Sequence, residues 1–167
     1  MEDQKDHFQQ QMSPPPDYQE AILPAWAFSN IVQHISQLIK GQLNYIEHPG
    51  QLIGLSLSYT LEDGQTYKLE FGTVEDSESP EADMPLSDDF LIYLYQSIND
   101  LIKEYSSYSG KISTELDLSI TGSHFRVTVT CRQVGVSECS NSPNHVGTQM
   151  YCMRVNHGAW RCLHGRC

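Results

Sequence analysis

The amino-acid sequence predicts an α+β fold: a single small domain in which two helices pack on an antiparallel sheet of four to six strands, preceded by a disordered N-terminal tail. Two segments carry apolar residues at helical spacing. Two further pairs of segments alternate apolar with polar residues and are joined by short turns. This alternation gives the sheet one wet face, which favours antiparallel strands. The 167 residues suffice for one domain with tails.

The tail is predicted over residues 1–23. Its first 13 residues hold three apolar side chains among Gln, Asp, Glu and Lys, too few to offset the entropy of ordering. Pro15, Pro16 and Tyr18 then fit PPxY, the peptide pattern that WW domains bind. The prolines pre-set a polyproline II backbone, so docking loses little entropy. A proline spacer that holds a tyrosine by chance is the alternative.

The first helix is predicted over residues 29–40, where apolar side chains recur every three or four positions, and Gly41 is predicted to close it. A hairpin follows, with strands over 55–61 and 67–71 around an Asp-Gly turn. Residues 75–89 predict an acidic, solvated loop.

The second helix is predicted to begin after Ser87, an N-cap followed by two acids, and to end near Tyr105. A second strand pair alternates over 112–120 and 125–131. The remaining pattern predicts a fifth strand over 148–155, a turn at 156–158 and a short return through Trp160. We therefore expect a core over 24–135 and a basic, Cys/His-containing segment over 136–167 that packs on the core or extends it.

Charge is unevenly distributed along the chain, whose formal net charge is −11. The segment after residue 122 contains five arginines and one acid, Glu138, so its net charge is +4. The segment up to residue 122 contains five lysines and twenty acids, so its net charge is −15. Such asymmetry suggests head-to-tail self-association or a basic face that meets an anionic membrane or RNA; a solvated edge of a small domain is the alternative. The candidate contact residues are Arg126, Arg132, Arg154, Arg161 and Arg166.

All five cysteines follow residue 130. The start of the chain lacks the basic and apolar regions of a secretory signal, so we expect reduced thiols in a cytosolic setting. Four residues form a candidate zinc set: Cys139, His145, Cys152 and Cys162. Their irregular spacing and the lack of a tight cysteine pair favour buried thiols instead.

The sequence contains no phosphate-binding glycine loop, G-x-S-x-G, H-E-x-x-H or C-x-x-C. We therefore expect no enzymatic activity, no cofactor and no small-molecule substrate. No apolar run is long enough to predict a transmembrane helix.

A tail with PPxY ahead of one small α+β domain resembles the matrix proteins of negative-strand RNA viruses, and rhabdovirus-type proteins most of all. In those proteins PPxY is a late-budding motif. The resemblance implies that Pro15, Pro16 and Tyr18 recruit a host WW-domain ubiquitin ligase. It also implies a homo-oligomer that contacts the membrane and the viral nucleocapsid, in virions and at the inner face of the host membrane. At the residue level only the motif matches, and the tail carries one lysine where that family is lysine-rich.

Two other functions fit the same residues. One is a cytosolic adaptor whose own stability is controlled by ligases bound at the PPxY motif. The other is a small Cys/His-rich accessory protein that binds nucleic acid through arginines and neighbouring aromatic rings.

Overall fold

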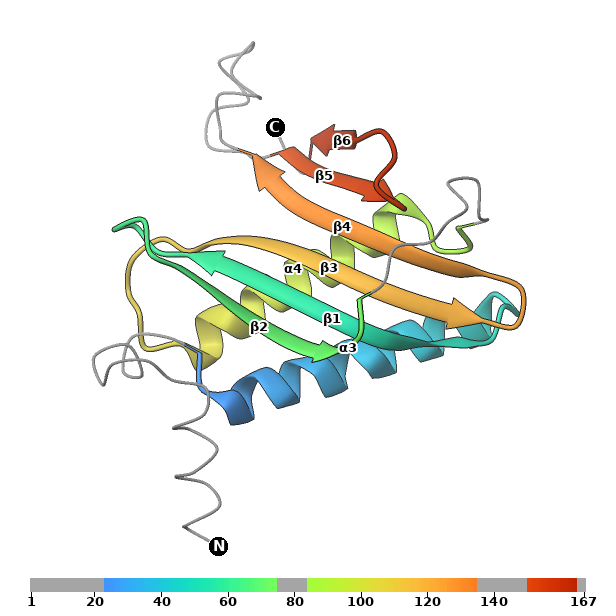
Figure 1. Cartoon of the computed structure of the whole chain (residues 1–167), viewed down its shortest axis with the longest axis horizontal. Helices are drawn as coiled ribbons and strands as arrows, with labels where there is room; N and C mark the ends of the chain where they lie inside the picture. The colour runs from blue at the N-terminus through green and yellow to red at the C-terminus, as the bar shows by residue number, and fades with distance from the viewer. Residues whose placement is uncertain (1–22, 75–83, 135–149, 165–167) are drawn as a thin grey trace, which may run out of the picture.

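The computed structural model describes residues 23–74, 84–134 and 150–164, and in them two helices pack on one six-stranded sheet (Figure 1). This confirms the predicted α+β class. In chain order the elements are α3 (Ala25–Tyr45), β1 (Gly50–Thr60), β2 (Thr66–Gly72), α4 (Asp88–Tyr105), β3 (Ser113–Gly122), β4 (Arg126–Val134), β5 (Met150–Val155) and β6 (Arg161–His164).

The strand order is β2-β1-β3-β4-β5-β6, and every neighbouring pair is antiparallel. Both predicted hairpins form, with Leu57 opposite Leu69 in the first and Leu118 opposite Val129 in the second. The helix α4 connects β2 to β3, which then pairs with the far side of β1. Strands β5 and β6 extend the same sheet beyond β4, so the predicted C-terminal segment contributes strands to the core sheet.

Both helices cover the same face of the sheet (Figure 1). The side chains between the two layers are aliphatic, and many have no exposed surface. Burial of this surface is the main force that holds the helices on the sheet. Its fully buried members include Ile31, Ile35, Leu43, Leu55, Leu57, Leu91, Leu94, Ile98, Leu116 and Leu118.

The other face of the sheet, here called the open face, carries hydroxyl and charged side chains. This follows from the strand alternation, since the residues between the buried aliphatic positions point away from the helices. On β3 and β4 these include Asp117, Ser119, Thr128 and Thr130, and the Thr130 hydroxyl donates to Asp117 Oδ1 at 2.5 Å. The alternation predicted a wet face, and this prediction was wrong for the middle of the sheet, where Ser119, Thr128 and Thr130 are buried.

The helix α3 is longer than predicted at both ends. It begins at Ala25 after Pro24 and continues through Gly41 to Tyr45. The prediction that Gly41 ends the helix was wrong because Leu43, one half-turn later, is fully buried and continues the apolar stripe. Packing of this stripe outweighs the roughly 1 kcal/mol that a glycine costs inside a helix.

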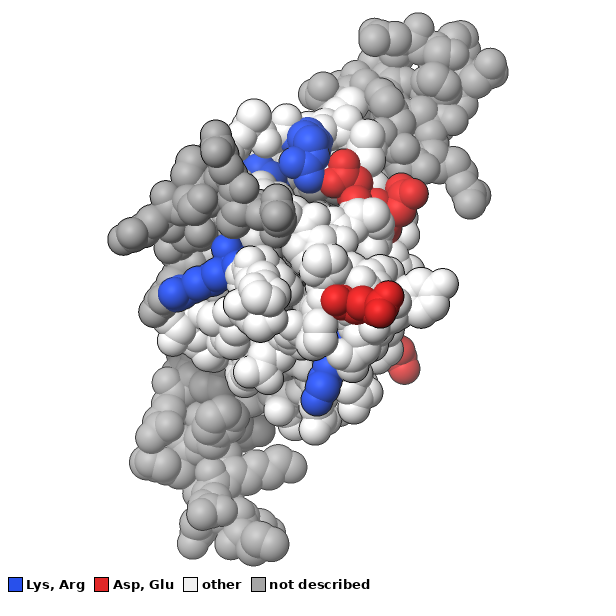
Figure 2. Space-filling view, turned by 90° about the vertical axis from the view of Figure 1, so that its right-hand side faces the viewer, with Lys and Arg blue, Asp and Glu red and all other residues white. Residues whose placement is uncertain are grey.

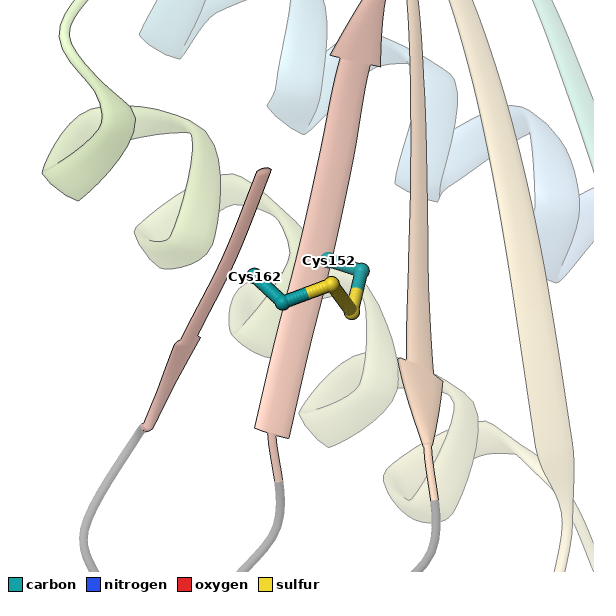
Figure 3. The surroundings of a disulfide bond; sticks show 2 residues. All are labelled: Cys152 and Cys162. Carbon is teal, nitrogen blue, oxygen red and sulfur yellow. A yellow bond between two sulfur atoms is a disulfide. The ribbon is translucent and has the colours of Figure 1, made fainter. Parts of the chain in front are cut away.

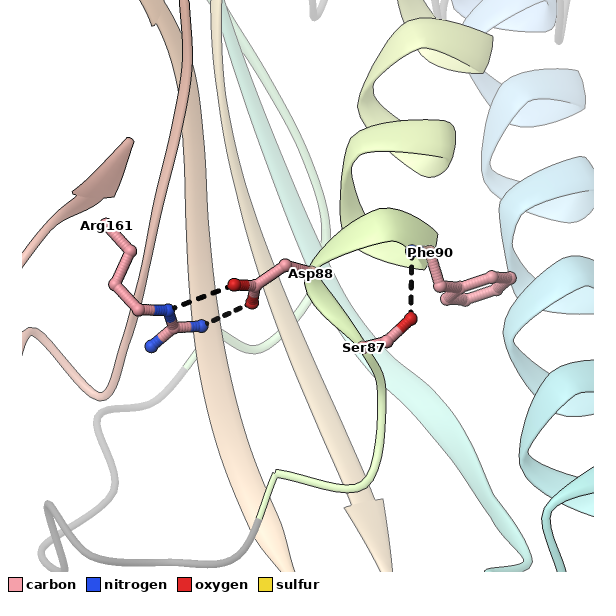
Figure 4. A network of polar contacts seen from close by, with 4 residues as sticks. All are labelled: Ser87, Asp88, Phe90 and Arg161. Atoms are coloured by element: carbon pink, nitrogen blue, oxygen red, sulfur yellow. Dashed lines mark hydrogen bonds and ion pairs between the residues drawn. The ribbon is translucent and has the colours of Figure 1, made fainter. Parts of the chain in front are cut away.

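The helix α4 begins as predicted. Ser87 is the N-cap, and its hydroxyl accepts a hydrogen bond from the Phe90 backbone N–H at 3.2 Å (Figure 4). Asp88 and Asp89 occupy the first turn, where negative charge complements the helix dipole. Neither α3 nor α4, the helices of the described part, is long and apolar enough to cross a membrane.

Candidate functional site

The PPxY residues Pro15, Pro16 and Tyr18 lie outside the described residues. The first described residue, Leu23, had been assigned to the tail but is buried in the core, and its N–H donates to the Tyr59 hydroxyl at 3.4 Å. The motif therefore ends five residues before a point where the chain is fixed to the domain.

A tight turn between β5 and β6 positions the C-terminal arginines. The Gly158 N–H donates to the Val155 carbonyl, and the central residues Asn156 and His157 both have positive φ, of 51° and 59°. This is the backbone twist that joins two antiparallel strands closely, and asparagine tolerates it well. The Asn156 side chain is buried and its Oδ1 accepts from the Thr128 N–H at 2.9 Å, which ties the turn to β4.

A disulfide joins Cys152 to Cys162 across β5 and β6 (Figure 3). The two residues are directly opposite in the strand register, with Cα atoms 4.0 Å apart. Their neighbours Tyr151 and Met153 pack against the core, so the disulfide lies on the open face. The expectation of reduced thiols was wrong for these two cysteines, because the hairpin register brings their sulfur atoms together.

The candidate zinc set is therefore not available as four ligands. Cys152 and Cys162 are bonded to each other, and Cys139 and His145 lie outside the described residues. Across the described ranges no three His, Cys, Asp or Glu side chains gather at a metal-binding distance. Cys131 is a free, buried thiol on β4, and burial, with smaller effects of Asp117 and Asp88, raises its pKa to about 12.

Two of the predicted arginines meet at one aromatic ring. The guanidinium carbon of Arg132, on β4, lies 4.0 Å from the centroid of the Trp160 ring, and that of Arg154, on β5, lies 4.5 Å from it. Both arginines alternate with core residues and so lie on the open face, beside the disulfide. We call Arg132, Arg154 and Trp160 the Arg-Trp cluster. Contact between a cation and an aromatic face is favourable, and arginine is the cation that uses it most often.

Among the described residues, no acidic side chain forms an ion pair with either arginine of the Arg-Trp cluster. Glu115 is directly opposite Arg132 in the strand register, yet no ion pair joins them among the described residues. The Nε atoms of Arg132 and Arg154 are buried and form no hydrogen bond within the described part of the chain. The cluster therefore combines one aromatic ring with two guanidinium groups that make no ion pair with a described carboxylate.

Arg161 has a different role. Its guanidinium makes two hydrogen bonds with Asp88, from Nη2 to Oδ1 at 2.7 Å and from Nε to Oδ2 at 3.3 Å (Figure 4). Because Asp88 begins α4, this pair joins β6 to the helix layer on the face opposite the cluster. The structure thus brings Arg132 and Arg154 together and separates Arg161 from them. Arg126 begins β4 on the open face, and Arg166 lies outside the described residues.

Positive charge does not form a broad patch on the end of the molecule seen in Figure 2. There the basic and acidic side chains are interspersed among uncharged ones. On this side of the molecule, recognition of an anion would therefore depend on a local arrangement of cations and not on a broad basic patch.

A recess of about 760 Å³ lies beside the end of α4, between that helix and the ends of β3, β4 and β5. Tyr95, Asn99 and Thr114 form a hydrogen-bond network at its side. The Tyr95 hydroxyl donates to the Thr114 carbonyl at 2.6 Å, and the Thr114 hydroxyl lies 2.7 Å from Asn99 Oδ1. Burial raises the pKa of Tyr95 to about 12. These polar groups satisfy one another, so we assign no ligand to the recess.

Comparison of the chain with protein-family models, with curated proteins and with solved structures found no match. The function must therefore be argued from the chain's own residues.

Proposed function

We propose that this chain is a non-enzymatic viral matrix or budding protein. It self-associates at membranes and recruits host WW-domain ubiquitin ligases through Pro15, Pro16 and Tyr18. The observation that carries the proposal is a PPxY sequence placed just ahead of a folded domain. The motif supplies the rigid proline pair and the tyrosine that WW domains read.

The distance between the motif and the domain supports recruitment. Leu23, which is anchored in the core, follows Tyr18 by five positions, and such a stretch spans at most about 18 Å. A bound WW domain would therefore stand close to the start of α3. At that end of the domain Trp26 is half exposed and its ring lies edge-on to Tyr105.

Self-association would compensate for a weak single contact. A short PPxY peptide orders few residues and buries little surface, so one copy binds weakly, whereas an assembly gains avidity from many copies. The unequal charge of the two parts of the chain supports head-to-tail contact between copies. The Cys152–Cys162 disulfide supports a protein that leaves the reducing cytosol, as a virion component does.

The direct test is a calorimetric titration of a WW domain from a ubiquitin ligase into the full-length chain. We expect binding by the wild type and loss of detectable binding in Tyr18→Ala, with unchanged thermal unfolding. Tyr45→Ala is the matched control, since Tyr45 is the most exposed large apolar side chain of the described residues and lies outside the motif. Equal binding by Tyr18→Ala and the wild type would refute the assignment.

A further inference from the structure

We propose that the Arg-Trp cluster, Arg132, Arg154 and Trp160, is a binding site for single-stranded nucleic acid. The inference does not depend on the PPxY motif, because it rests on side chains of β4, β5 and the β5–β6 turn. It assigns a ligand class to two of the five arginines and adds an aromatic residue to them.

The first argument is the unused bonding capacity of the cluster. Two guanidinium groups lie against one ring, and neither is neutralised by a carboxylate among the described residues. Their Nε atoms are buried without partners. Two like charges at one ring repel each other, and a phosphate bound by their terminal Nη groups would relieve that repulsion. The guanidinium fork matches phosphate geometry in a way that an ammonium group does not.

The second argument is the aromatic ring that both arginines contact and the position of a third arginine on the same strand. Single-stranded nucleic acid is bound by aromatic and guanidinium planes that stack on bases, next to cations that contact the backbone. On β4, Arg126 lies on the same face as Arg132, about 20 Å away along the strand, but the residues between them on this face, Thr128 and Thr130, are buried. A single strand would therefore be held at the cluster itself, by Arg132 and Arg154, and not along the whole of β4.

The other charges of the open face favour a narrow ligand over a flat one. A membrane surface laid on this face would also meet Glu70 on β2, whose carboxylate would repel anionic lipid. A single strand bound at the cluster passes Glu115, which is opposite Arg132, but does not cover β2. The observations therefore favour nucleic acid over a vesicle surface.

The test uses full-length protein and a fluorescein-labelled oligouridine of roughly 12 nucleotides. The chain has two tryptophans, so Trp26→Phe leaves Trp160 as the only tryptophan reporter. We expect saturable binding by fluorescence anisotropy and quenching of Trp160 emission. In this background Arg132→Gln with Arg154→Gln should weaken binding at least about tenfold and lower the slope of log K against log salt by about 1.4.

Two controls make the result specific. Lys68→Gln removes a cation of the open face that already pairs with Glu70 at 3.6 Å, and it should change the affinity less than about twofold. Arg132→Lys with Arg154→Lys keeps both charges but removes the planar forks. This variant should lose most of the quenching, and it serves in place of the glutamine variant if that variant fails to fold. The variant Tyr18→Ala, which lacks the PPxY tyrosine, should bind the oligonucleotide like the wild type. Loss of nucleic-acid binding and loss of ligase recruitment can therefore be told apart.

Three results would overturn the proposal. The first is absence of oligouridine binding. The second is equal weakening by Lys68→Gln and by the double arginine variants, which would indicate nonspecific charge. The third is a double variant that binds oligouridine normally but loses binding to phosphatidylserine vesicles or to a phosphoserine peptide, which would assign the cluster to one of those ligands.

Discussion

Arg132 lies with its guanidinium carbon 4.0 Å from the centroid of the Trp160 ring, although a carboxylate residue, Glu115, is its direct neighbour on β3. The arginine thus contacts an aromatic ring from the edge of the sheet in preference to an ion pair within the sheet. Arg154 approaches the same ring, which follows the β5–β6 turn and lies two residues before the disulfide-bonded Cys162.

Trp160 should stabilise the hairpin as well as the arginines. We expect Trp160→Ala to lower the free energy of unfolding by about 1–2 kcal/mol, since two cation–π contacts are lost, and Trp160→Phe to lose less. Urea unfolding followed by circular dichroism measures both variants. A change below 0.5 kcal/mol in Trp160→Ala would mean that the ring is not in contact with the arginines in solution.

The disulfide should contribute to stability by restricting the unfolded chain. Cys152 and Cys162 are ten residues apart, and closure of a loop of this size is worth up to about 3 kcal/mol. Dithiothreitol should therefore lower the melting temperature of the wild type. It should have no effect on a Cys152→Ser, Cys162→Ser double variant, which already melts at the reduced value. Equal melting temperatures of the oxidised wild type and this variant would contradict the prediction.

Asn156 should be the residue of the β5–β6 turn that is hardest to replace. Asn156→Ala removes the acceptor for the Thr128 N–H and places a poorly suited side chain at a φ of 51°, so we expect a loss of about 2 kcal/mol. Asn156→Gly keeps the backbone freedom and should lose about half as much. Chemical unfolding of the two variants separates the lost hydrogen bond from the backbone effect. Equal losses would show that the hydrogen bond alone matters.

Stability should fall in alkaline solution because of two buried groups. Folding raises the pKa of Cys131 from 9.0 and that of Tyr95 from 10.0, each to about 12. Between about pH 9 and 12 the unfolded chain therefore binds fewer protons than the folded chain, and the free energy of unfolding decreases as the pH rises. Below pH 9 these two groups add no pH dependence. Urea titrations from pH 8 to 11 measure the slope.

Tyr95→Phe tests the tyrosine's share of this slope. It should cost about 1–2 kcal/mol at pH 7, since the Thr114 carbonyl loses a buried donor, and it should flatten the alkaline decline. Tyr93→Phe, on the same helix but half exposed, is the matched control and should change stability by less than about 0.5 kcal/mol. An unchanged slope in Tyr95→Phe would contradict the assignment.

Local patterns predicted most of the fold. The alternation around Leu57 and Leu118 sets the two central hairpins, and Ser87 marks the start of α4, because each signal lies within a few residues of its effect. The end of α3 was not predictable in this way. Whether Gly41 stops the helix depends on burial of Leu43 against the sheet, and that is a tertiary contact.

The site was predictable only as a set of candidate residues. The sequence indicated that arginines concentrate late in the chain, but the contact of Arg132 with Trp160 spans 28 residues and three elements. The alternation of side chains along β4 and β5 was the one sequence pattern that could have indicated this site, since it places Arg132 and Arg154 on the same face of the sheet. The disulfide was missed because its pairing follows from the β5–β6 register, and the predicted return through Trp160 did not specify that register.

Ligase recruitment to membranes by the PPxY motif is the central claim, and co-flotation tests it most directly. A labelled WW domain is mixed with phosphatidylserine vesicles and the full-length chain, and the floated fraction is measured together with the light scattering of the chain. We predict that the WW domain floats with the wild type as oligomers grow, and that it stays in solution with Tyr18→Ala, which itself still floats. A wild-type chain that binds the WW domain but remains a monomer in solution would contradict the matrix function and leave a soluble adaptor.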